Sequence, residues 1–146
     1  MKHLTIDETA ALNEHAAWRG FVETRGLHEG DKIHLTGGQY GGPNRLYRVE
    51  SKCSDNDFYY KLYGVPDFHH LDDCTLLATE SDLWDFVAGH LRWNLKFERV
   101  GFGWKFASFE LSPEQSNMYY DTRRAALYAC TLAVLEGMEA ADGTPA

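Results

Sequence analysis

The segment richest in groups that could do chemistry is residues 68–74 (FHHLDDC). Imidazole, carboxylate and thiolate groups are good ligands for zinc and similar ions, so the candidate metal ligands are His69, His70, Asp72 and Cys74. Adjacent side chains on an extended segment point to opposite sides, which prevents His69 and His70 from gripping one ion together. No second cluster at ligand spacing completes a set of four. We therefore predict a solvated turn after a strand, with no bound metal and no cofactor.

Nucleophilic catalysis needs a Cys or Ser beside a base that a third group orients. Cys74 with His69 or His70 is the only local pairing of this kind, and no G-x-S-x-G elbow is present. Asp72 and Asp73 are sequence neighbours, which is a poor geometry for separate acid and base roles. We predict no catalytic residues, and keep a small metal-dependent or cysteine hydrolase centred on His69, His70 and Cys74 as an alternative.

A glycine-rich segment, residues 37–42 (GGQYGG), could in principle wrap an anion with backbone amides. It lacks the G-K-[ST] ending of a P-loop and the G-x-G-x-x-G spacing, and it leads into a strand rather than a helix. These features favour a flexible loop between strands. If the loop contacts a partner, Tyr40 is the residue we expect to do so.

Aromatic side chains are a stronger signal, at 14% of the 146 residues. Rings occupy both faces of the predicted strand 58–63, and only one face can point into a small barrel, so Tyr59 or Tyr63 is expected to lie outward. A second group, residues 118–120 (MYY), precedes the last helix. Packing between the two halves of the chain explains both groups most simply, with an external interface as the alternative. The candidate partner-binding residues are Tyr40, Tyr59, Tyr63, Tyr119, Tyr120, Arg123 and Arg124.

Arg123 and Arg124 are included because they open the predicted last helix, where the helix macrodipole disfavours cations. Such local conflicts sometimes mark contact sites. Pairing with Asp121 or Glu114 is the structural alternative, and we predict that pairing.

The charged residues of the chain favour some classes of binding partner over others. The formal net charge is −8, from 14 basic and 22 acidic residues, and no segment forms the basic patch on which nucleic-acid affinity mostly rests. A basic protein partner is therefore favoured and nucleic acid is disfavoured. No apolar run has membrane-spanning length, and the odd number of cysteines lacks C-x-x-C spacing. We expect a cytoplasmic location with reduced thiols.

The elements that would position these residues begin with a helix predicted over residues 5–25. Thr5 and Glu8 have capping-box spacing, and Gly26 is the expected stop. Strands are predicted at residues 33–35, 46–50 and 58–63, with a closing segment at 71–76. Because short strands cannot cover both faces of an open sheet, we predict a small closed, five-stranded barrel.

Residues 30–42 (GDKIHLTGGQYGG) followed by 46–49 (LYRV) resemble the opening of a small Src-homology-type barrel, in particular a KOW-like one. Residues 60–64 (YKLYG) and 71–76 (LDDCTL) resemble its third strand and closing segment, while residues 43–45 (PNR) depart from the KOW pattern. The resemblance implies a barrel that serves as a nucleic-acid-binding module, which is a second functional alternative.

In the rest of the chain, a helix capped by Ser81 and ending at Asn94 is predicted, followed by a hairpin of residues 95–99 and 104–111. Asp121 or Thr122 would cap the last helix, and Gly137 would end it. This order resembles a small sandwich domain of phage and prophage proteins, through Trp104 and residues 122–126 (TRRAA). The resemblance implies a phage or prophage origin.

The predicted fold class is α+β: an N-terminal helix (1–27), a small barrel (28–79), an α-β-β-α two-layer sandwich (80–140) and a disordered tail (141–146). The parts are expected to form one compact unit with a seam at residues 78–80. The leading functional hypothesis is a non-enzymatic, phage-type accessory protein that binds a host or phage protein. One version is an inhibitor of a nucleic-acid-handling complex. The oligomeric state is left open.

Overall fold

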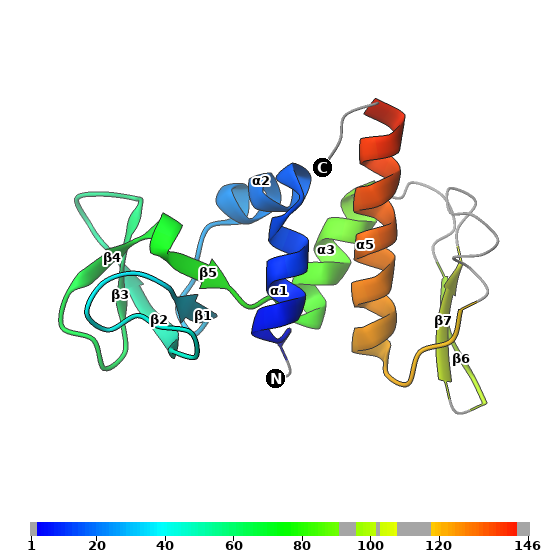
Figure 1. Ribbon diagram of the computed structural model, residues 1–146, viewed down its shortest axis with the longest axis horizontal. Coiled ribbons are helices and arrows are strands. Elements are labelled where there is room, and N and C mark those ends of the chain that lie inside the picture. The colour runs from blue at the N-terminus through cyan, green and yellow to red at the C-terminus, as the bar shows by residue number, and fades with distance from the viewer. Residues whose placement is uncertain (1–2, 91–95, 102, 108–117, 143–146) are drawn as a thin grey trace. The chain divides into compact units, whose positions relative to one another are not determined.

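The computed structural model describes residues 3–90, 96–101, 103–107 and 118–142, and they form an α+β fold (Figure 1). The chain divides into two compact units, residues 1–78 and 79–146. In the described part, the first unit holds two helices and a five-stranded sheet, and the second holds two helices and a β-hairpin. No described helix is long and apolar enough to cross a membrane.

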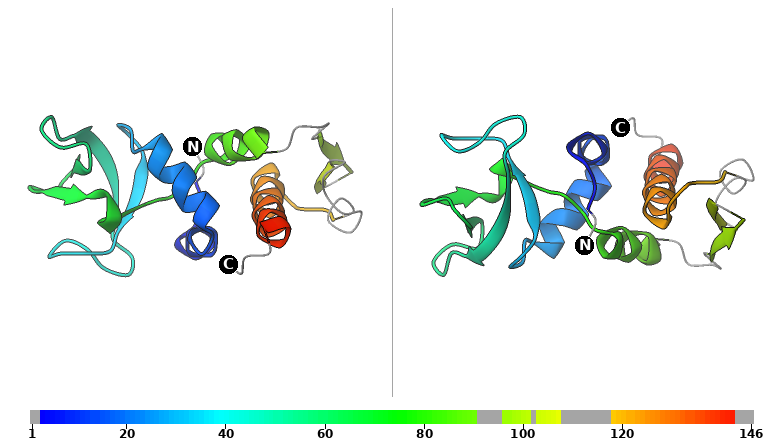
Figure 2. Two further views of the ribbon diagram at one scale, coloured as in Figure 1. Left: turned by 90° about the horizontal axis from the view of Figure 1, so that it is seen from above. Right: turned by 90° about the horizontal axis from the view of Figure 1, so that it is seen from below.

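Two helices occupy the region for which a single helix was predicted. They are α1 (Ile6–Asn13) and α2 (Ala16–Arg25), and they run in different directions (Figures 1 and 2). The predicted capping box is confirmed, because the Thr5 amide donates to Glu8 Oε1 (3.0 Å) and the Glu8 amide donates to Thr5 Oγ1 (3.1 Å). The single helix is wrong because His15 has an extended backbone (φ −101°, ψ 123°) that breaks the helical run. Gly26 ends α2 as predicted, with φ 70°.

The sheet of the first unit is antiparallel, in the order β4-β3-β2-β1-β5. Its strands are β1 (Lys32–Leu35), β2 (Leu46–Lys52), β3 (Tyr59–Leu62), β4 (Phe68–His70) and β5 (Cys74–Leu76). A short 3-10 helix, η1 (Leu71–Asp73), joins β4 to β5. Residues 68–70 are therefore a strand, where a solvated turn was predicted.

The predicted closed barrel is wrong, because β4 and β5 remain the two edges of an open sheet. In an antiparallel order with three strands between them, these two edges run in the same direction. Neighbouring parallel strands need a crossover of a dozen or more residues, and η1 supplies three. The short connection therefore prevents β4 from pairing with β5.

One face of the sheet is buried and forms the core of the first unit. Its strands contribute every second side chain to this face, in the alternation typical of a half-buried sheet. Val22 of α2, Tyr40 and Leu71 pack against the core from other parts of the unit. The strand residues of the core are Ile33, Leu35, Val49, Tyr60, Leu62, Cys74 and Leu76.

The second unit has the predicted order helix, hairpin, helix: α3 (Glu80–His90), β6 (Lys96–Val100), β7 (Gly103–Ala107) and α5 (Arg123–Asp142). Thr79, rather than Ser81, caps α3. The Thr79 amide donates to Asp82 Oδ2 (2.9 Å), and the Asp82 amide donates to Thr79 Oγ1 (3.4 Å). Thr79 has the correct spacing because α3 begins at Glu80, one residue before Ser81.

The last helix, α5, packs against α3 and β7. Thr122 caps it as predicted, accepting from the Ala125 amide at 3.0 Å. Gly137 does not end it, because the helix continues to Asp142. A glycine inside a helix costs only about 1 kcal/mol relative to alanine, which the packing of a long helix offsets. The predicted stop at Asn94, the hairpin beyond residue 107 and the tail from residue 143 lie outside the described residues.

Candidate protein-contact surface

The outer face of the sheet, opposite the core, carries aromatic side chains at its β3–β4 end. Along β3, Tyr60 and Leu62 are buried while Tyr59 is exposed, as strand alternation requires. Residues directly opposite each other in a ladder share a face. Tyr59 pairs with His70 and Lys61 pairs with Phe68, so β4 extends the same outer face.

Four aromatic side chains in this region are solvent-exposed: Phe58 (53%), Tyr59 (37%), Tyr63 (50%) and Phe68 (49%). The His70 ring links two of them. It meets Tyr59 edge-on, with ring centroids 5.1 Å apart, and lies nearly parallel to Phe58 at 6.2 Å. We call these residues (Phe58, Tyr59, Tyr63, Phe68 and His70) the aromatic face.

Backbone hydrogen bonds hold this surface in place. The Leu71 amide donates to the Phe58 carbonyl (2.7 Å), and the Phe58 amide donates to Asn56 Oδ1 (3.0 Å). The Asp72 amide donates to His70 Nδ1 (3.1 Å), which orients the imidazole. These bonds fix the backbone at Phe58 and Leu71 and the orientation of the His70 ring.

Tyr63, at the end of β3, is linked to the turn before β1. Its hydroxyl donates to Glu29 Oε1 at 3.4 Å. The neighbouring Glu29 carboxylate raises the pKa of Tyr63 above its ordinary value, so the phenol stays a neutral hydrogen-bond donor.

A hollow of about 560 Å³ adjoins the aromatic face within the first unit. Phe58 and His70 belong to both. The first two helices contribute Asn13, Arg19, Val22 and Glu23 to its lining, and the chain from η1 to β5 contributes Leu71, Asp72, Cys74, Thr75 and Leu76. Four of its lining residues, Val22, Leu71, Cys74 and Leu76, belong to the core of the first unit or pack against it.

The four residues considered as metal ligands do not gather at one point. His69 lies opposite the buried Tyr60 and therefore points to the inner face, while His70 is on the outer face. Burial, together with the Asp73 carboxylate, raises the pKa of Cys74 to about 12. Among the described residues there is no group of three or more His, Cys, Asp or Glu side chains that could hold a metal ion.

The glycine-rich loop is fastened to the first unit on both sides. The Gly42 amide donates to the Leu35 carbonyl (3.0 Å), and the Thr36 amide donates to the Asp73 carbonyl (3.0 Å). Tyr40 is half-buried against the core, and its carbonyl accepts from the Tyr47 hydroxyl at 2.8 Å. The structure thus gives Tyr40 a packing contact and places it apart from the aromatic face.

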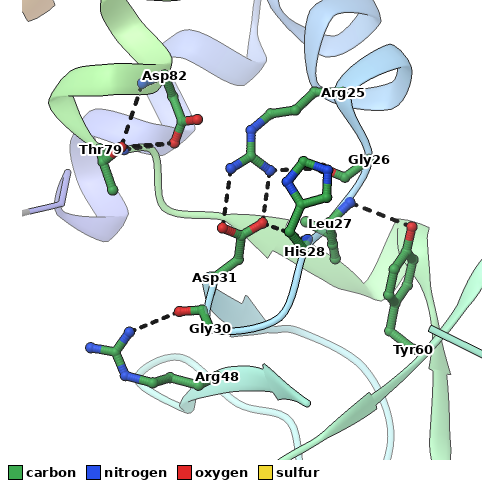
Figure 3. A network of polar contacts seen from close by, with 10 residues as sticks. All are labelled: Arg25, Gly26, Leu27, His28, Gly30, Asp31, Arg48, Tyr60, Thr79 and Asp82. Atoms are coloured by element: carbon green, nitrogen blue, oxygen red, sulfur yellow. Dashed lines mark hydrogen bonds and ion pairs between the residues drawn. The ribbon is translucent and has the colours of Figure 1, made fainter. Parts of the chain in front are cut away.

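A polar network fastens α2 to the start of the sheet (Figure 3). Arg25 binds both oxygens of Asp31, at 2.7 and 3.1 Å, and the His28 amide donates to Asp31 Oδ2 (2.7 Å). Burial alone would raise the pKa of Asp31. The Arg25 guanidinium and the His28 amide overcome that effect and lower it below its ordinary value. The network is structural, because both charged side chains are only 16% exposed.

Residues 118–120 (MYY), which precede α5, include both exposed and packed side chains. Met118 and Tyr119 are 53% and 58% exposed. Tyr120 bridges to Trp104 through two backbone hydrogen bonds of 2.7 Å, and its ring stacks on Phe106 at 5.9 Å. Burial raises the pKa of Tyr120. A hollow of about 320 Å³ between β7 and α5 is lined in part by Met118 and Tyr120.

Arg123 pairs with Glu80, across the second unit. Its Nε and a terminal nitrogen donate to Glu80 Oε2 at 3.0 and 2.7 Å. The predicted partner Asp121 is therefore replaced by an acidic residue from the start of α3, and Glu114 lies outside the described residues. Arg124 is half-buried. The cost of a cation at a helix start is thus offset by a carboxylate distant in sequence.

Sequence reasoning found Tyr59 and Tyr63 but missed three other members of the aromatic face. Phe68 and His70 were placed in a turn, and Phe58 was not selected although its strand was. Residues 68–70 (FHH) carry no alternation of apolar and polar side chains, so the sequence holds no signal for β4, which is defined by its pairing with β3.

No family model matches this chain, and neither a characterised protein nor a solved structure shows a significant match to it.

Proposed function

We propose that this chain is a non-enzymatic protein that binds another protein through the aromatic face. The observation that carries the proposal is the presence of four exposed aromatic side chains at the β3–β4 end of the sheet, two of which, Phe58 and Tyr59, contact the His70 ring. Aromatic residues are enriched at protein interfaces, where they supply large contact areas at low entropic cost.

Electrostatics favours a protein over a nucleic acid as the partner. The formal net charge of the chain is −8, and of the basic residues on β2 and β3, Lys52 pairs with a carboxylate, that of Asp57 (3.4 Å). Binding of a nucleic acid rests mostly on a basic surface that neutralises phosphates, which this charge disfavours.

The chemistry of Cys74 argues against the hydrolase alternative. A catalytic thiol is activated by a lowered pKa or an adjacent base. The pKa of Cys74 is raised instead, and the Nδ1 atom of His70, the imidazole that shares the hollow with it, accepts from the Asp72 amide.

We further propose that residues 30–76 are related to the Src-homology-type fold in strand order, with the sheet left open rather than closed into a barrel. The strand order β4-β3-β2-β1-β5, the long loop after β1 and the 3-10 helix between the last two strands support this proposal. Fold likeness alone carries no function.

Site-specific photo-crosslinking tests the proposed function. A benzophenone amino acid replaces Tyr59 or Tyr63 in one pair of proteins and Tyr119, the exposed residue of the second unit, in a matched control. We expect the same partner to be crosslinked from both positions on the aromatic face and not from position 119. The double variant Tyr59→Ser/Tyr63→Ser should abolish recovery of that partner in an affinity pull-down, which needs no photo-reactive residue, while its far-ultraviolet circular dichroism is unchanged.

Capture from position 119, undiminished in the double variant, would contradict the proposal and place the interface on the second unit. Failure to crosslink a partner from any of the three positions would also overturn the proposed function.

A further inference from the structure

The outer edge of β4 carries backbone groups that the sheet leaves unused. The Leu71 amide donates to the Phe58 carbonyl, and the ladder alternates, so His69 exchanges hydrogen bonds with Tyr60. The amides and carbonyls of Phe68 and His70 therefore point away from β3. Outside the ladder to β3 the Phe68 backbone has no hydrogen bond to another described residue, whereas the His70 carbonyl opens the first turn of η1, which leaves the His70 amide as the outward group at that residue.

This edge is accessible and lies at the end of the sheet beyond β3 (Figure 1). Phe68 is 49% exposed, and the His70 side chain is 36% exposed. Open edges are templates for another strand, and β-strand addition is a common way to bind extended peptides.

Carboxylates flank the edge at both ends. Asp67 precedes β4 and is exposed, and the Asp72 side chain, two residues after β4, is 89% exposed. Asp57, next to Phe58, is 81% exposed. This arrangement is complementary to Lys or Arg side chains on an incoming segment.

We infer that the β4 edge binds an extended, basic peptide segment of the partner as a sixth strand. This inference rests on the proposed function and names the chemistry of its partner. The segment accepts hydrogen bonds from the Phe68 and His70 amides and donates to the Phe68 carbonyl, and its outward side chains lie beside the aromatic face. Its Lys or Arg residues pair with Asp67 and Asp72.

A second copy of this chain fits the edge less well. Antiparallel self-pairing centred on His69 would bring Asp67 of one copy diagonally beside Asp72 of the other. It would also set Pro66, which has no amide hydrogen, opposite Asp72. Both features oppose self-association and leave a basic segment as the favoured occupant.

His70→Pro is a selective test of strand addition. The His70 backbone has φ −68° and ψ 146°, which proline adopts without strain, and its amide is not used in the ladder to β3. The substitution removes one outward donor and places a ring at the edge. His70→Ala is the matched control, because it also loses the imidazole but keeps the amide.

The probe is a seven-residue synthetic peptide, acetyl-Lys-Val-Arg-Tyr-Lys-Val-Arg-amide, added to isotope-labelled full-length protein. We expect the amides of Phe68 and His70 to shift and to gain protection from hydrogen exchange. The dissociation constant should be about tenfold weaker for His70→Pro than for His70→Ala, which corresponds to loss of a buried hydrogen bond.

A separate experiment tests whether the bound peptide must be basic. Asp67→Asn/Asp72→Asn should weaken binding severalfold and flatten its dependence on salt, whereas a peptide with Glu in place of every Lys and Arg should not bind. Equal affinities for His70→Pro and His70→Ala would overturn strand addition. Binding of the acidic peptide, or a dimer that protects the β4 amides without any peptide, would overturn the basic partner.

The two proposals fail separately. A partner that still crosslinks to positions 59 and 63 when His70→Pro is introduced would refute strand addition and leave the aromatic face as the interface. Loss of the partner from an affinity pull-down with Tyr59→Ser/Tyr63→Ser but not with His70→Pro would lead to the same conclusion.

Discussion

The Asp31 carboxylate connects the end of α2 to the turn that precedes β1. Arg25 at the end of α2 and the His28 amide in the turn both donate to it, as Figure 3 shows. A bidentate ion pair of this kind, mostly buried, is stronger than an exposed one.

The pH dependence of stability should reveal this pair. The pKa of Asp31 is lowered from an ordinary value of 3.8, so its stabilisation is complete above that pH and is lost as the pH falls through the lower folded value. We expect Arg25→Gln to lower the free energy of unfolding by about 1.5 kcal/mol at pH 6 and by less below pH 3.8. Urea titrations from about pH 2.5 to 6 would measure this difference.

Arg19→Gln is the matched control for that series, because Arg19 donates to a backbone carbonyl, that of Asn13, on the exposed surface. As the pH falls, the free energy of unfolding of Arg19→Gln should change in the same way as that of the parent protein. An Arg25→Gln penalty that does not shrink with falling pH would show that lost packing, rather than the ion pair, is responsible.

The cysteines differ in accessibility. Burial raises the pKa of Cys74 and of Cys130 to about 12, whereas Cys53 is half-buried. We expect an aromatic disulfide reagent at pH 8 to modify Cys53 first and the other two only on unfolding, because the thiolate is the reactive form. Absorbance of the released thiol, with Cys53→Ser as control, would measure it. Rapid labelling of Cys53→Ser protein under native conditions would contradict this assignment.

At the scale of elements, local signals were sufficient for two of the three helix caps that join residues three apart, and the Thr79–Asp82 cap of α3 was missed. The capping box of α1 and the Thr122 cap of α5 were predicted because both involve residues three apart. The break at His15 was not predicted, because the apolar stripe continues through it: Leu12 and Trp18 are both buried. Periodicity reports which face is buried but not where the helix changes direction.

Thr5→Ala should test the first of these caps. Loss of the hydroxyl leaves the Glu8 amide without its acceptor, and we expect the free energy of unfolding to fall by about 1 kcal/mol. Thr24→Ala, an exposed threonine inside α2, should have an effect near zero or slightly stabilising. Chemical denaturation of both variants would measure the contrast, and equal effects would argue against the cap.

The glycine-rich loop offers a prediction based on close packing. A Cβ on Gly41 would lie 2.4 Å from the Gly37 carbonyl oxygen, so Gly41→Ala must displace the backbone. We expect a loss of about 1 to 3 kcal/mol. Gly20→Ala is the matched control, since nothing lies within 4 Å of its Cβ and it is inside α2. That variant should gain up to about 1 kcal/mol. Thermal unfolding of the pair would compare them, and a neutral Gly41→Ala would contradict the loop geometry.

At the scale of the whole molecule, the sequence was sufficient for the α+β class and for the order of most elements, but not for sheet closure. Strand existence follows from alternation, whereas closure depends on the direction of β4 relative to β5 and on the length of η1. Phe68 and His70 were missed for the same reason, because a three-residue strand is defined by its pairing with β3 rather than by its own pattern. Tyr59 and Tyr63 were selected because rings fall on both faces of the predicted strand 58–63, and only one face of a strand can point into the core.

The net charge of −8 predicts a stability that depends on salt. Repulsion among carboxylates opposes the compact state, and added ions screen it. Raising NaCl from about 20 to about 200 mM should therefore raise the Tm by a few degrees at pH 7, and by much less near the isoelectric point of 5.3. Calorimetry at the two pH values would show it. A Tm that falls with salt at pH 7 would mean that attractive ion pairs dominate.

The pairing of Ile33 with Leu76 has a consequence for biosynthesis. As the chain leaves the ribosome, β1 to β4 can join neighbour to neighbour, because each pairs with the strand just before or after it. The other edge of β1 stays unpaired until β5 emerges, which happens after β1 to β4 have left the ribosome. Nascent chains paused before residue 76 would therefore display an apolar strand to solvent, and that interval is when a ribosome-associated chaperone would bind them.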